Sequence, residues 1–532
     1  MRLPEVTYAL SKSGSENVSL HGINWSDSLQ DGDLRESENI SARRYPYFTT
    51  RHARAQQKRG ETFYQNGIGM TAWGKLVVIE KTTDSSGAEV GQIYYDGEAI
   101  GTVTAGEKQF AVVNTRMVIW PDKVYIDMPT KTIRKMEADF TASKPAFTTS
   151  TLKISESTDL TTLFAVGDAV EISGCTQTYN NKSVIIKALT SDTITVAADT
   201  FKYSDTSTST SWTDASTAVK IERSVPDMDY ICESENRLWG CSSAAQTIYA
   251  SALGDPTNFN VFEGLSTDSY ALGVGTEGDF TGCCKLSTSV LFWKESKLHK
   301  MLGSYPAEYS LTSYDIDGLM AGCHKSMQVI NEVLFYMGLH GIFAYSGGTP
   351  SLISQNFGER RFSDGVGGND GDTYFLSVKD EGGKAHLLVY ETRYGIWLHE
   401  DDTEAMDFAR VGRDMYMLDA DGNVWLEDSG ADDTQLPWTM QFTPFYETVQ
   451  GHKSYSKVTM RFELPKGSYV TAEIRTDGKT WQQVGKLVGN VHDIATLRLP
   501  INRCDKFELR LSGKGECTLL GLYREFYVGS EA

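Results

Sequence analysis

One hairpin pattern recurs along this sequence, and it limits the possible folds more than any other feature. Each unit is an apolar or aromatic strand, a short polar turn and a second aromatic strand, found at residues 236–251, 290–300, 332–345, 386–398 and 414–426. Alternating runs joined by Gly, Asp or Asn turns are typical of β-hairpins. The units begin roughly 30–55 residues apart, and a propeller blade repeats every ~40–50 residues. Because one blade cannot bury both its faces, the repeat predicts blades stacked in a ring.

Two further hairpin units precede these five. The first joins the runs 75–80 and 92–95 and turns at Asp96-Gly97, and the second spans 110–126. No long amphipathic helix is indicated anywhere in the chain. We therefore predict an all-β protein with a β-propeller of about six or seven blades, formed by residues 61–139 and 223–430.

Two other regions differ in character from the repeat. Residues 140–222 are rich in Ser and Thr at both flanks and contain short alternating strands, which predicts a small β-barrel inserted between blades. Such an insertion is tolerated because the entropy of loop closure grows slowly with length. After a polar break near Asp428, residues 437–532 alternate again over several strands, which favours an antiparallel β-sandwich.

Residues 1–60 hold few apolar runs and predict an extended N-terminal arm. Between Ser41 and Gly60 the arm carries basic residues and no acid, whereas the whole chain has a formal net charge of −20. We interpret this segment as an arm that contacts other subunits, with the candidate contact residues Arg43, Arg44, Arg51, Arg54, Lys58 and Arg59. The alternatives are a solvated segment, pairing with an acidic neighbour, and a nucleic-acid contact.

The overall charge and the absence of long apolar runs exclude several classes of protein. A chain this acidic is not a general nucleic-acid binder, because that binding needs clustered Lys and Arg. No run approaches the ~18 apolar residues that cross a bilayer. No secretory signal is indicated at the N-terminus, so the eight cysteines are expected to be buried thiols rather than disulfides or zinc ligands.

Three short motifs resemble functional sites without meeting their requirements. Residues 273–278 fit GxGxxG, but no helical pattern follows and Glu277 would repel a phosphate, so we expect a loop between blades. Residues 419–423 lack the spacing of a calcium loop and indicate a hairpin turn. Residues 475–481 resemble a sialidase Asp-box that is one residue short. With no HExxH and no GxSxG, we predict no catalytic residue, no metal and no cofactor, and interpret the chain as a protein that is not an enzyme.

The repeat nevertheless resembles a known group of proteins. Residues 236–240 (NRLWG), followed by 249–259 (YASALGDPTNF), resemble the β-propeller proteins of tailed-bacteriophage virions. An arm, a propeller and a C-terminal β-domain with a strand–Asp-Gly–strand hairpin are arranged similarly in the tail hub, or packaged-DNA stabilisation, proteins of short-tailed phages. Residues 476–479 and 507–515 resemble that domain. The inserted module resembles small β-modules of phage structural proteins, but it departs from the hub proteins.

This resemblance implies a structural component of a virion, in the tail or head-to-tail connector, forming a ring around the DNA exit channel. The implied partners are copies of the chain itself, other tail or connector proteins and, transiently, packaged DNA. The implied location is the virion, after assembly in the cytoplasm of the bacterial host. The alternative is a receptor- or glycan-binding propeller at the tail tip, and a glycan-cleaving propeller enzyme is less favoured.

Overall fold

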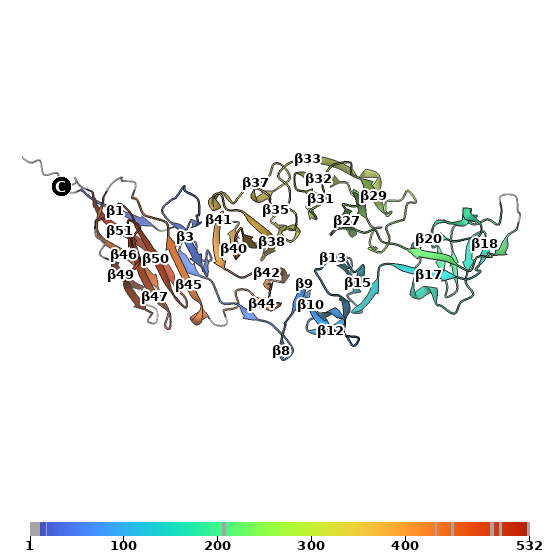
Figure 1. Cartoon of the computed structure of the whole chain (residues 1–532), viewed down its shortest axis with the longest axis horizontal. Helices are drawn as coiled ribbons and strands as arrows, with labels where there is room; N and C mark the ends of the chain where they lie inside the picture. Colours follow the sequence, from blue (N-terminus) through green and yellow to red (C-terminus); the bar gives the residue numbers. More distant parts are fainter. Residues whose placement is uncertain are drawn as a thin grey trace, which may run out of the picture. The chain divides into compact units, whose positions relative to one another are not determined.

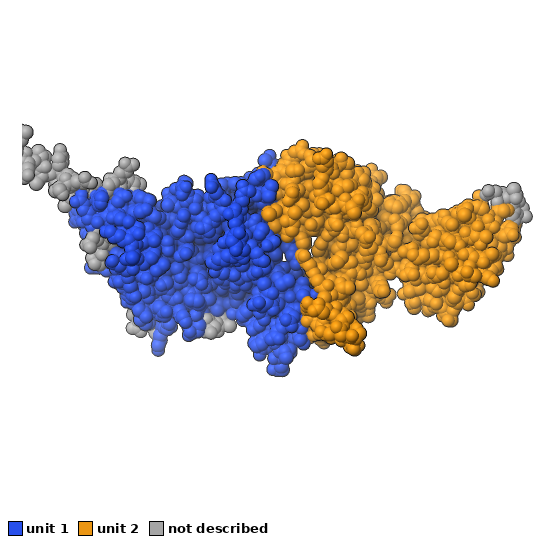
Figure 2. Space-filling model, in the orientation of Figure 1, with its two compact units in different colours: residues 1–80, 325–532 blue, residues 81–324 orange. Residues whose placement is uncertain are grey.

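The computed structural model describes residues 11–17, 19–204, 209–430, 433–447, 452–489, 494–499 and 503–528, and the fold is all-β (Figure 1). Helical segments in these ranges are short 3-10 turns: η1 (Leu160–Thr162), η2 (Thr178–Asn180), η3 (Pro306–Glu308), η4 (His324–Ser326), η5 (Gln355–Phe357) and η6 (Asp433–Gln435). None of the described helices is long and apolar enough to cross a membrane. The chain divides into two compact units, residues 81–324 and residues 1–80 with 325–532 (Figure 2).

Seven four-stranded sheets form the blades of a β-propeller. Three of them lie in residues 81–324. The first contains β13 (Gln109–Val113), β14 (Arg116–Trp120), β15 (Val124–Asp127) and β16 (Thr132–Lys135), and the second contains β26 (Tyr230–Ser234), β27 (Arg237–Ser242), β28 (Thr247–Ala250) and β29 (Tyr270–Gly273). The third contains β30 (Gly282–Leu286), β31 (Ser289–Lys294), β32 (Lys297–Leu302) and β33 (Ser310–Asp315). The sheet of β9 (Gly67–Trp73), β10 (Lys75–Thr83), β11 (Glu89–Tyr95) and β12 (Glu98–Thr104) contains the unit boundary, which falls within β10.

The other three blades lie in the unit of residues 1–80 and 325–532. They are β34 (Gln328–Ile330), β35 (Val333–Gly338), β36 (Gly341–Tyr345) and β37 (Ser351–Leu352); β38 (Phe362–Asn369), β39 (Thr373–Asp380), β40 (Ala385–Glu391) and β41 (Ile396–Asp401); and β42 (Ala405–Val411), β43 (Asp414–Asp419), β44 (Val424–Leu426) and β6 (Ala55–Gln56). The strand β6 comes from the N-terminal segment and pairs antiparallel with β44, so the last blade is completed by the start of the chain.

The burial of the second strand in two of the blades shows how the sheets stack. Every residue of β27 and of β31 is buried. A strand covered by neighbouring sheets on both faces is mostly apolar instead of alternating, and its few polar side chains are hydrogen-bonded, as Arg237 is to the carbonyl oxygen of Ser251. Within residues 81–324, β13 contacts β26 and β26 contacts β30; within the other unit, β34 contacts β38, β38 contacts β42 and β42 contacts β9. The first strand of one sheet therefore lies beside the first strand of the next, as the innermost strands of a propeller do.

The module inserted between β16 and β26 consists of two sheets around one core. The first contains β17 (Ala138–Ala142), β25 (Val219–Arg223), β20 (Ala169–Ser173) and β21 (Lys182–Ile185); the second contains β22 (Ala188–Leu189), β23 (Thr193–Thr195), β19 (Thr151–Lys153), β18 (Ala146–Thr148) and β24 (Ser211–Thr213). Phe147, Ile172 and Phe201 belong to the shared core. The predicted small β-barrel is therefore wrong, because a barrel needs an unbroken ladder and these short strands form two open sheets.

The C-terminal region forms a β-sandwich that includes strands from the N-terminal segment. One sheet contains β4 (Ile40–Ser41), β5 (Phe48–Thr50), β51 (Thr518–Val528), β46 (Ser454–Glu463), β49 (Ile494–Leu499) and β1 (Ser11–Asn17). The other contains β2 (Gly22–Ile23), β3 (Asp33–Glu38), β45 (Pro437–Phe442), β50 (Phe507–Lys514), β47 (Tyr469–Thr476) and β48 (Gln482–Val488). β2 and β3 are parallel. Aromatic rings join the layers: Phe48 lies 5.2 Å from Phe442, and Tyr455 lies 4.8 Å from Phe507, between ring centroids.

The segment expected to be an extended arm therefore supplies strands to two parts of the same unit. β1 to β5 belong to the sandwich, and β6 belongs to the last blade. The hairpin of β7 (Lys58–Arg59) and β8 (Thr62–Phe63) follows β6. Strands with few apolar residues are stable here because they extend sheets whose cores are built by later parts of the chain.

Candidate functional site

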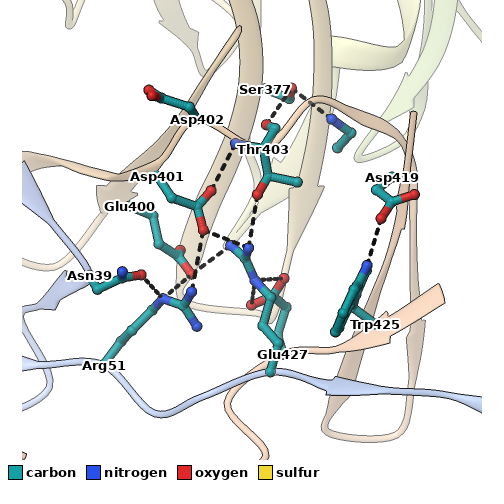
Figure 3. Close-up of polar contacts among 12 residues, drawn as sticks. Asn39, Arg51, Ser377, Glu400, Asp401, Asp402, Thr403, Asp419, Trp425 and Glu427 are labelled. Carbon is teal, nitrogen blue, oxygen red and sulfur yellow. Dashed lines mark hydrogen bonds and ion pairs between the residues drawn. The ribbon is translucent and has the colours of Figure 1, made fainter. Parts of the chain in front are cut away.

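Two arginines of the predicted contact segment are buried against three carboxylates of the propeller (Figure 3). Arg54 donates from Nε to Glu427 Oε2 (2.9 Å), from Nη1 to Asp401 Oδ2 (2.7 Å) and from Nη2 to Glu400 Oε1 (2.8 Å). Arg51 Nε lies 2.8 Å from Glu400 Oε1, and Nη2 lies 3.3 Å from Asp401 Oδ2. We call Arg51, Arg54, Glu400, Asp401 and Glu427 the arginine clasp. It fastens the N-terminal segment to β41 and to the residue that follows β44.

The clasp holds one more negative group than positive, and the pKa values of its acids diverge accordingly. Burial alone would raise the pKa of Asp401, but Arg54 and Arg51 outweigh it and the pKa is lowered. Burial raises the pKa of Glu427 to about 7, with Glu400 adding to the shift and Arg54 opposing it. Because two like charges in a dry site disfavour each other, the extra carboxylate is the group that gains a proton most readily.

The other four predicted contact residues also have partners within the chain. Arg43 Nη2 lies 3.0 Å from Glu516 Oε1, and Arg44 pairs with Glu463. Arg59 Nη2 lies 3.0 Å from Glu80 Oε2, and Lys58 Nζ lies 4.7 Å from the ring centroid of Phe63. Arg43 and Arg44 therefore tie the N-terminal segment to the sandwich, and Arg51 and Arg54 tie it to the last two blades. Contact of these residues with another subunit stays a prediction.

An acidic cavity of about 870 Å³ lies within residues 81–324. The carboxylates of Glu107, Asp229, Glu277, Asp279 and Glu295 line it, together with the aromatic rings of Trp120, Tyr230 and Phe280. The strands β13, β14, β26 and β31 contribute to it, as do the loops before β26, before β30 and after β31. The combination of flat rings and several acids suits a polar ligand that also has apolar faces.

The GxGxxG motif forms part of the wall of this cavity. Residues 274–281 connect β29 to β30 without a helix, as expected for a loop between blades. Buried Lys294 holds the loop through Nζ, which donates to the carbonyl oxygens of Thr276 (2.9 Å) and Gly278 (2.6 Å) and to Gln246 Oε1 (2.7 Å). Burial lowers the pKa of Lys294, and the nearby Asp279 opposes that shift. The motif therefore presents Glu277 to the cavity, while the carbonyl oxygens of Thr276 and Gly278 accept hydrogen bonds from Lys294.

Two histidines and an aspartate gather where β40 and β41 face β3. His386 Nδ1 lies 3.4 Å from His399 Nε2, and Asp402 Oδ1 lies 3.3 Å from His399 Nε2 and 3.8 Å from His386 Nδ1. His386 Nε2 lies 3.2 Å from Asp380 Oδ2, and His399 Nδ1 lies 3.0 Å from the carbonyl oxygen of Ser37. We call His386, His399 and Asp402 the histidine cluster. Its three donor atoms all lie within 4.8 Å of one another.

The sequence analysis does not identify this cluster. His386 lies at the start of the hairpin predicted at 386–398, and His399 and Asp402 lie just beyond its end. A shift in register between Leu387 and Leu388 pairs Leu387 with Asp401 and Leu388 with His399. A bulge of this kind redirects side chains, and it cannot be read from an alternating pattern.

Comparisons with known proteins place the chain near several solved structures at low similarity. No family model matches the sequence, and no curated protein matches it. BamB from Moraxella catarrhalis is 9% identical with a TM-score of 0.34, over 71% of this chain and 97% of that one. U3-55K is 6% identical with a TM-score of 0.35, over 71% and 98%. An exo-β-1,3-galactanase from Phanerochaete chrysosporium is 9% identical with a TM-score of 0.22, over 53% and 92%.

Proposed function

We propose that this protein is a non-enzymatic structural component of a bacteriophage virion, part of the tail or head-to-tail connector, and that its copies form a ring around the DNA exit channel. The observation that supports this proposal best is the fastening of the N-terminal segment into two β-domains of one unit. Strands β1 to β5 join the sandwich, β6 completes the last blade, and the arginine clasp lies between them. A scaffold that must carry load gains from having its N-terminal segment paired into sheets of two domains.

The charge of the chain suits passage of DNA. A formal net charge of −20 repels the phosphate backbone, so DNA slides past such a surface without binding it. Repeated copies of an asymmetric chain close into a ring through heterologous contacts. The partners that follow from this proposal are other copies of the chain and neighbouring tail or connector proteins.

The test is the position and copy number of the chain in intact particles. Virions made from the genome that encodes this chain are purified, and their proteins are quantified by mass spectrometry and located by electron microscopy. We expect several copies per particle in a symmetric ring at the head–tail junction or in the tail. Absence of the chain from purified virions would overturn the proposal. Turnover of a glycan by the purified protein, lost on replacing one carboxylate, would overturn its non-enzymatic part.

A receptor- or glycan-binding propeller at the tail tip is the second candidate, and the acidic cavity favours it. Aromatic rings beside carboxylates are a common way to hold a sugar, with its apolar face on a ring and its hydroxyls on the acids. The double variant Glu277→Gln with Asp279→Asn changes exposed acids of the cavity, and Glu61→Gln is the matched control. This candidate would be favoured if the double variant lost binding to a glycan array while Glu61→Gln kept it, and if the chain were located at the tail tip.

A further inference from the structure

The ring nitrogens of the histidine cluster that face one another carry lone pairs in the neutral state. A carbonyl oxygen can only accept, so His399 Nδ1, 3.0 Å from the Ser37 carbonyl, carries the hydrogen and Nε2 is left bare. An ionised carboxylate likewise only accepts, so His386 carries its hydrogen on Nε2, 3.2 Å from Asp380 Oδ2, and Nδ1 is left bare. Partners of this kind fix the tautomer of histidines that bind metals.

The geometry of these lone pairs requires a positive charge between them. The two bare nitrogens are 3.4 Å apart, and Asp402 Oδ1 is 3.3 Å from one of them. Two lone pairs and a carboxylate at this separation repel one another unless a proton or a metal ion lies among them. The second oxygen of Asp402 is already engaged, because Oδ2 lies 2.8 Å from Lys384 Nζ, so Oδ1 is the oxygen directed to the histidines.

The separations distinguish a tetrahedral ion from an octahedral one. Bonds of about 2.0–2.1 Å to zinc place the ligands of a tetrahedral site roughly 3.3–3.4 Å apart. The same bond lengths around octahedral magnesium place adjacent ligands only about 2.9 Å apart. The observed separations of 3.3, 3.4 and 3.8 Å fit the tetrahedral case without moving the backbone. Imidazole nitrogen is also a preferred ligand of zinc and a poor ligand of magnesium or calcium.

We propose that His386, His399 and Asp402 bind one zinc-class divalent ion, with the fourth coordination position open. A cavity of about 430 Å³ in the same unit touches the cluster at His399 and Asp402 and is lined by the further acids Glu36, Glu38, Asp401 and Glu473. The open position therefore takes a water molecule supplied from this cavity, and the surrounding acids attract cations to it. Bound metal would fasten β40 and β41 to β3, whose Ser37 carbonyl orients His399. This inference is independent of the proposed function.

The test is metal binding by the full-length chain after treatment with a chelator. Zn²⁺ is titrated against a chromophoric competitor, and Co²⁺ replaces it for visible spectroscopy. We expect one ion per chain, tetrahedral Co²⁺ bands without a thiolate charge-transfer band, and no comparable binding of Mg²⁺ or Ca²⁺. The eight cysteines make the missing thiolate band essential, because they are the competing zinc ligands.

Two variants and one control assign the binding to the cluster. Asp402→Asn changes a half-exposed residue after β41, so the fold is kept, and it should weaken Zn²⁺ binding by about 10–100-fold; His386→Gln should do the same or more. His340→Gln, in the exposed turn between β35 and β36, should leave binding unchanged. Zinc binding that persists in both cluster variants would overturn the proposal. So would the absence of any stoichiometric binding, which would leave a shared proton between the histidines.

Discussion

Arg54 is the residue on which most of the charge of the arginine clasp depends, because each of its three nitrogens bonds a different carboxylate. Bringing these ions out of water costs several kcal/mol per ion, and their attraction offsets that cost only while the bonding is complete. The clasp therefore contributes little net stability, and its main effect is to hold the N-terminal segment in one register. Removing one charged partner lowers the free energy of unfolding by much more than the net stabilisation that the intact ion pairs provide.

Replacement of Arg54 by Met should destabilise the unit that contains it by about 3–5 kcal/mol, because buried Glu400 and Glu427 and half-buried Asp401 lose a shared cation. Arg44→Met is the matched control: its pair with Glu463 is exposed on both sides, and its loss should cost no more than ~1 kcal/mol. Urea unfolding followed by tryptophan fluorescence measures both. Equal costs for the two variants would show that the clasp is not a buried ion network.

The pKa of Glu427 predicts a particular dependence of stability on pH. Burial raises that pKa from 4.5 to about 7, so the folded state binds a proton that the unfolded state has released between these values. The contribution of Glu427 to the free energy of unfolding is then fully present below pH ~4.5 and is lost as pH rises through ~7. The loss is on the order of 1–3 kcal/mol. Glu427→Gln keeps a neutral side chain at every pH and should remove this part of the decline.

The measurement is the unfolding free energy of both proteins at intervals from pH 5 to 8. The stability of Glu427→Gln relative to the parent chain should increase steadily over that range. Glu61→Gln, at an exposed acid near the β7–β8 turn, should run parallel to the parent. If the unfolding free energy of the parent chain rises with pH relative to that of Glu427→Gln, Glu427 is ionised in the folded protein.

At the scale of elements, the attachment of β6 to β44 shows how a two-residue strand is held by its surroundings. Its backbone pairing is extended by Gln57, whose N–H donates to the carbonyl oxygen of Val424 at 2.7 Å. The side chain of Gln56 donates to Asn423 Oδ1 at 3.1 Å. So few hydrogen bonds would not hold an isolated strand, and the ion pairs of the arginine clasp, just before β6, provide the remaining stabilisation.

Gln57→Pro should release this strand from the last blade, because proline removes the N–H that bonds Val424. Gln57→Ala keeps that N–H and loses only the side chain, which makes it the matched control. We expect the proline variant to be less stable than the alanine variant by about 1–3 kcal/mol, with faster hydrogen exchange at residues 424–426. Identical exchange in the two variants would mean that β6 does not contribute to holding the blade.

The sequence pattern predicts elements that are stabilised locally and misses those that are stabilised at long range. The hairpin expected at 290–300 is found as β31 and β32, because apolar runs and a tight turn are present in one short stretch. The strand β3 reads Asp-Leu-Arg-Glu-Ser-Glu, which has no strand pattern, and it forms because β45 pairs with it from 400 residues further on. The partners of Arg51 and Arg54 are also distant, 346 to 373 residues further along the sequence, so the contact segment could be recognised by its charge but its acids could not.

At the scale of the whole molecule, most sheets are local in sequence and a few ladders join the two ends of the chain. Each complete blade before the last consists of consecutive strands, whereas the last blade and both sandwich sheets need residues 11–56 together with residues beyond 400. Closing such long loops is slow because the entropy is lost before the contacts form. We infer that the blades form first and that the N-terminal segment docks last.

The inserted module should be removable, because its two ends meet within its own first sheet. Ala138 pairs with Arg223 across β17 and β25, so a short Gly-Ser linker can replace 138–223 without stretching the propeller. The module has its own core, which includes Leu152, Val170 and Ile221, and it should fold when expressed alone. Its contacts with Asn258, in the loop after β28, are polar: Asn258 Oδ1 accepts from Ala169 N (3.1 Å), and Asn258 Nδ2 donates to Asp168 Oδ1 (3.3 Å). Within the loop, Asn258 Nδ2 also donates to Asp255 Oδ2 (2.7 Å).

The deletion variant should therefore keep a β-rich circular dichroism spectrum and a cooperative thermal transition close to that of the parent. Asn258 retains Asp255 as a partner when the module is absent, so no buried amide is left without a hydrogen bond. Removing β31 and β32 instead, residues 289–302, deletes a hairpin whose second-strand side chains fill the space between blades, and should abolish soluble expression. If both deletions fail alike, the module is part of the folding core of residues 81–324 rather than an addition to it.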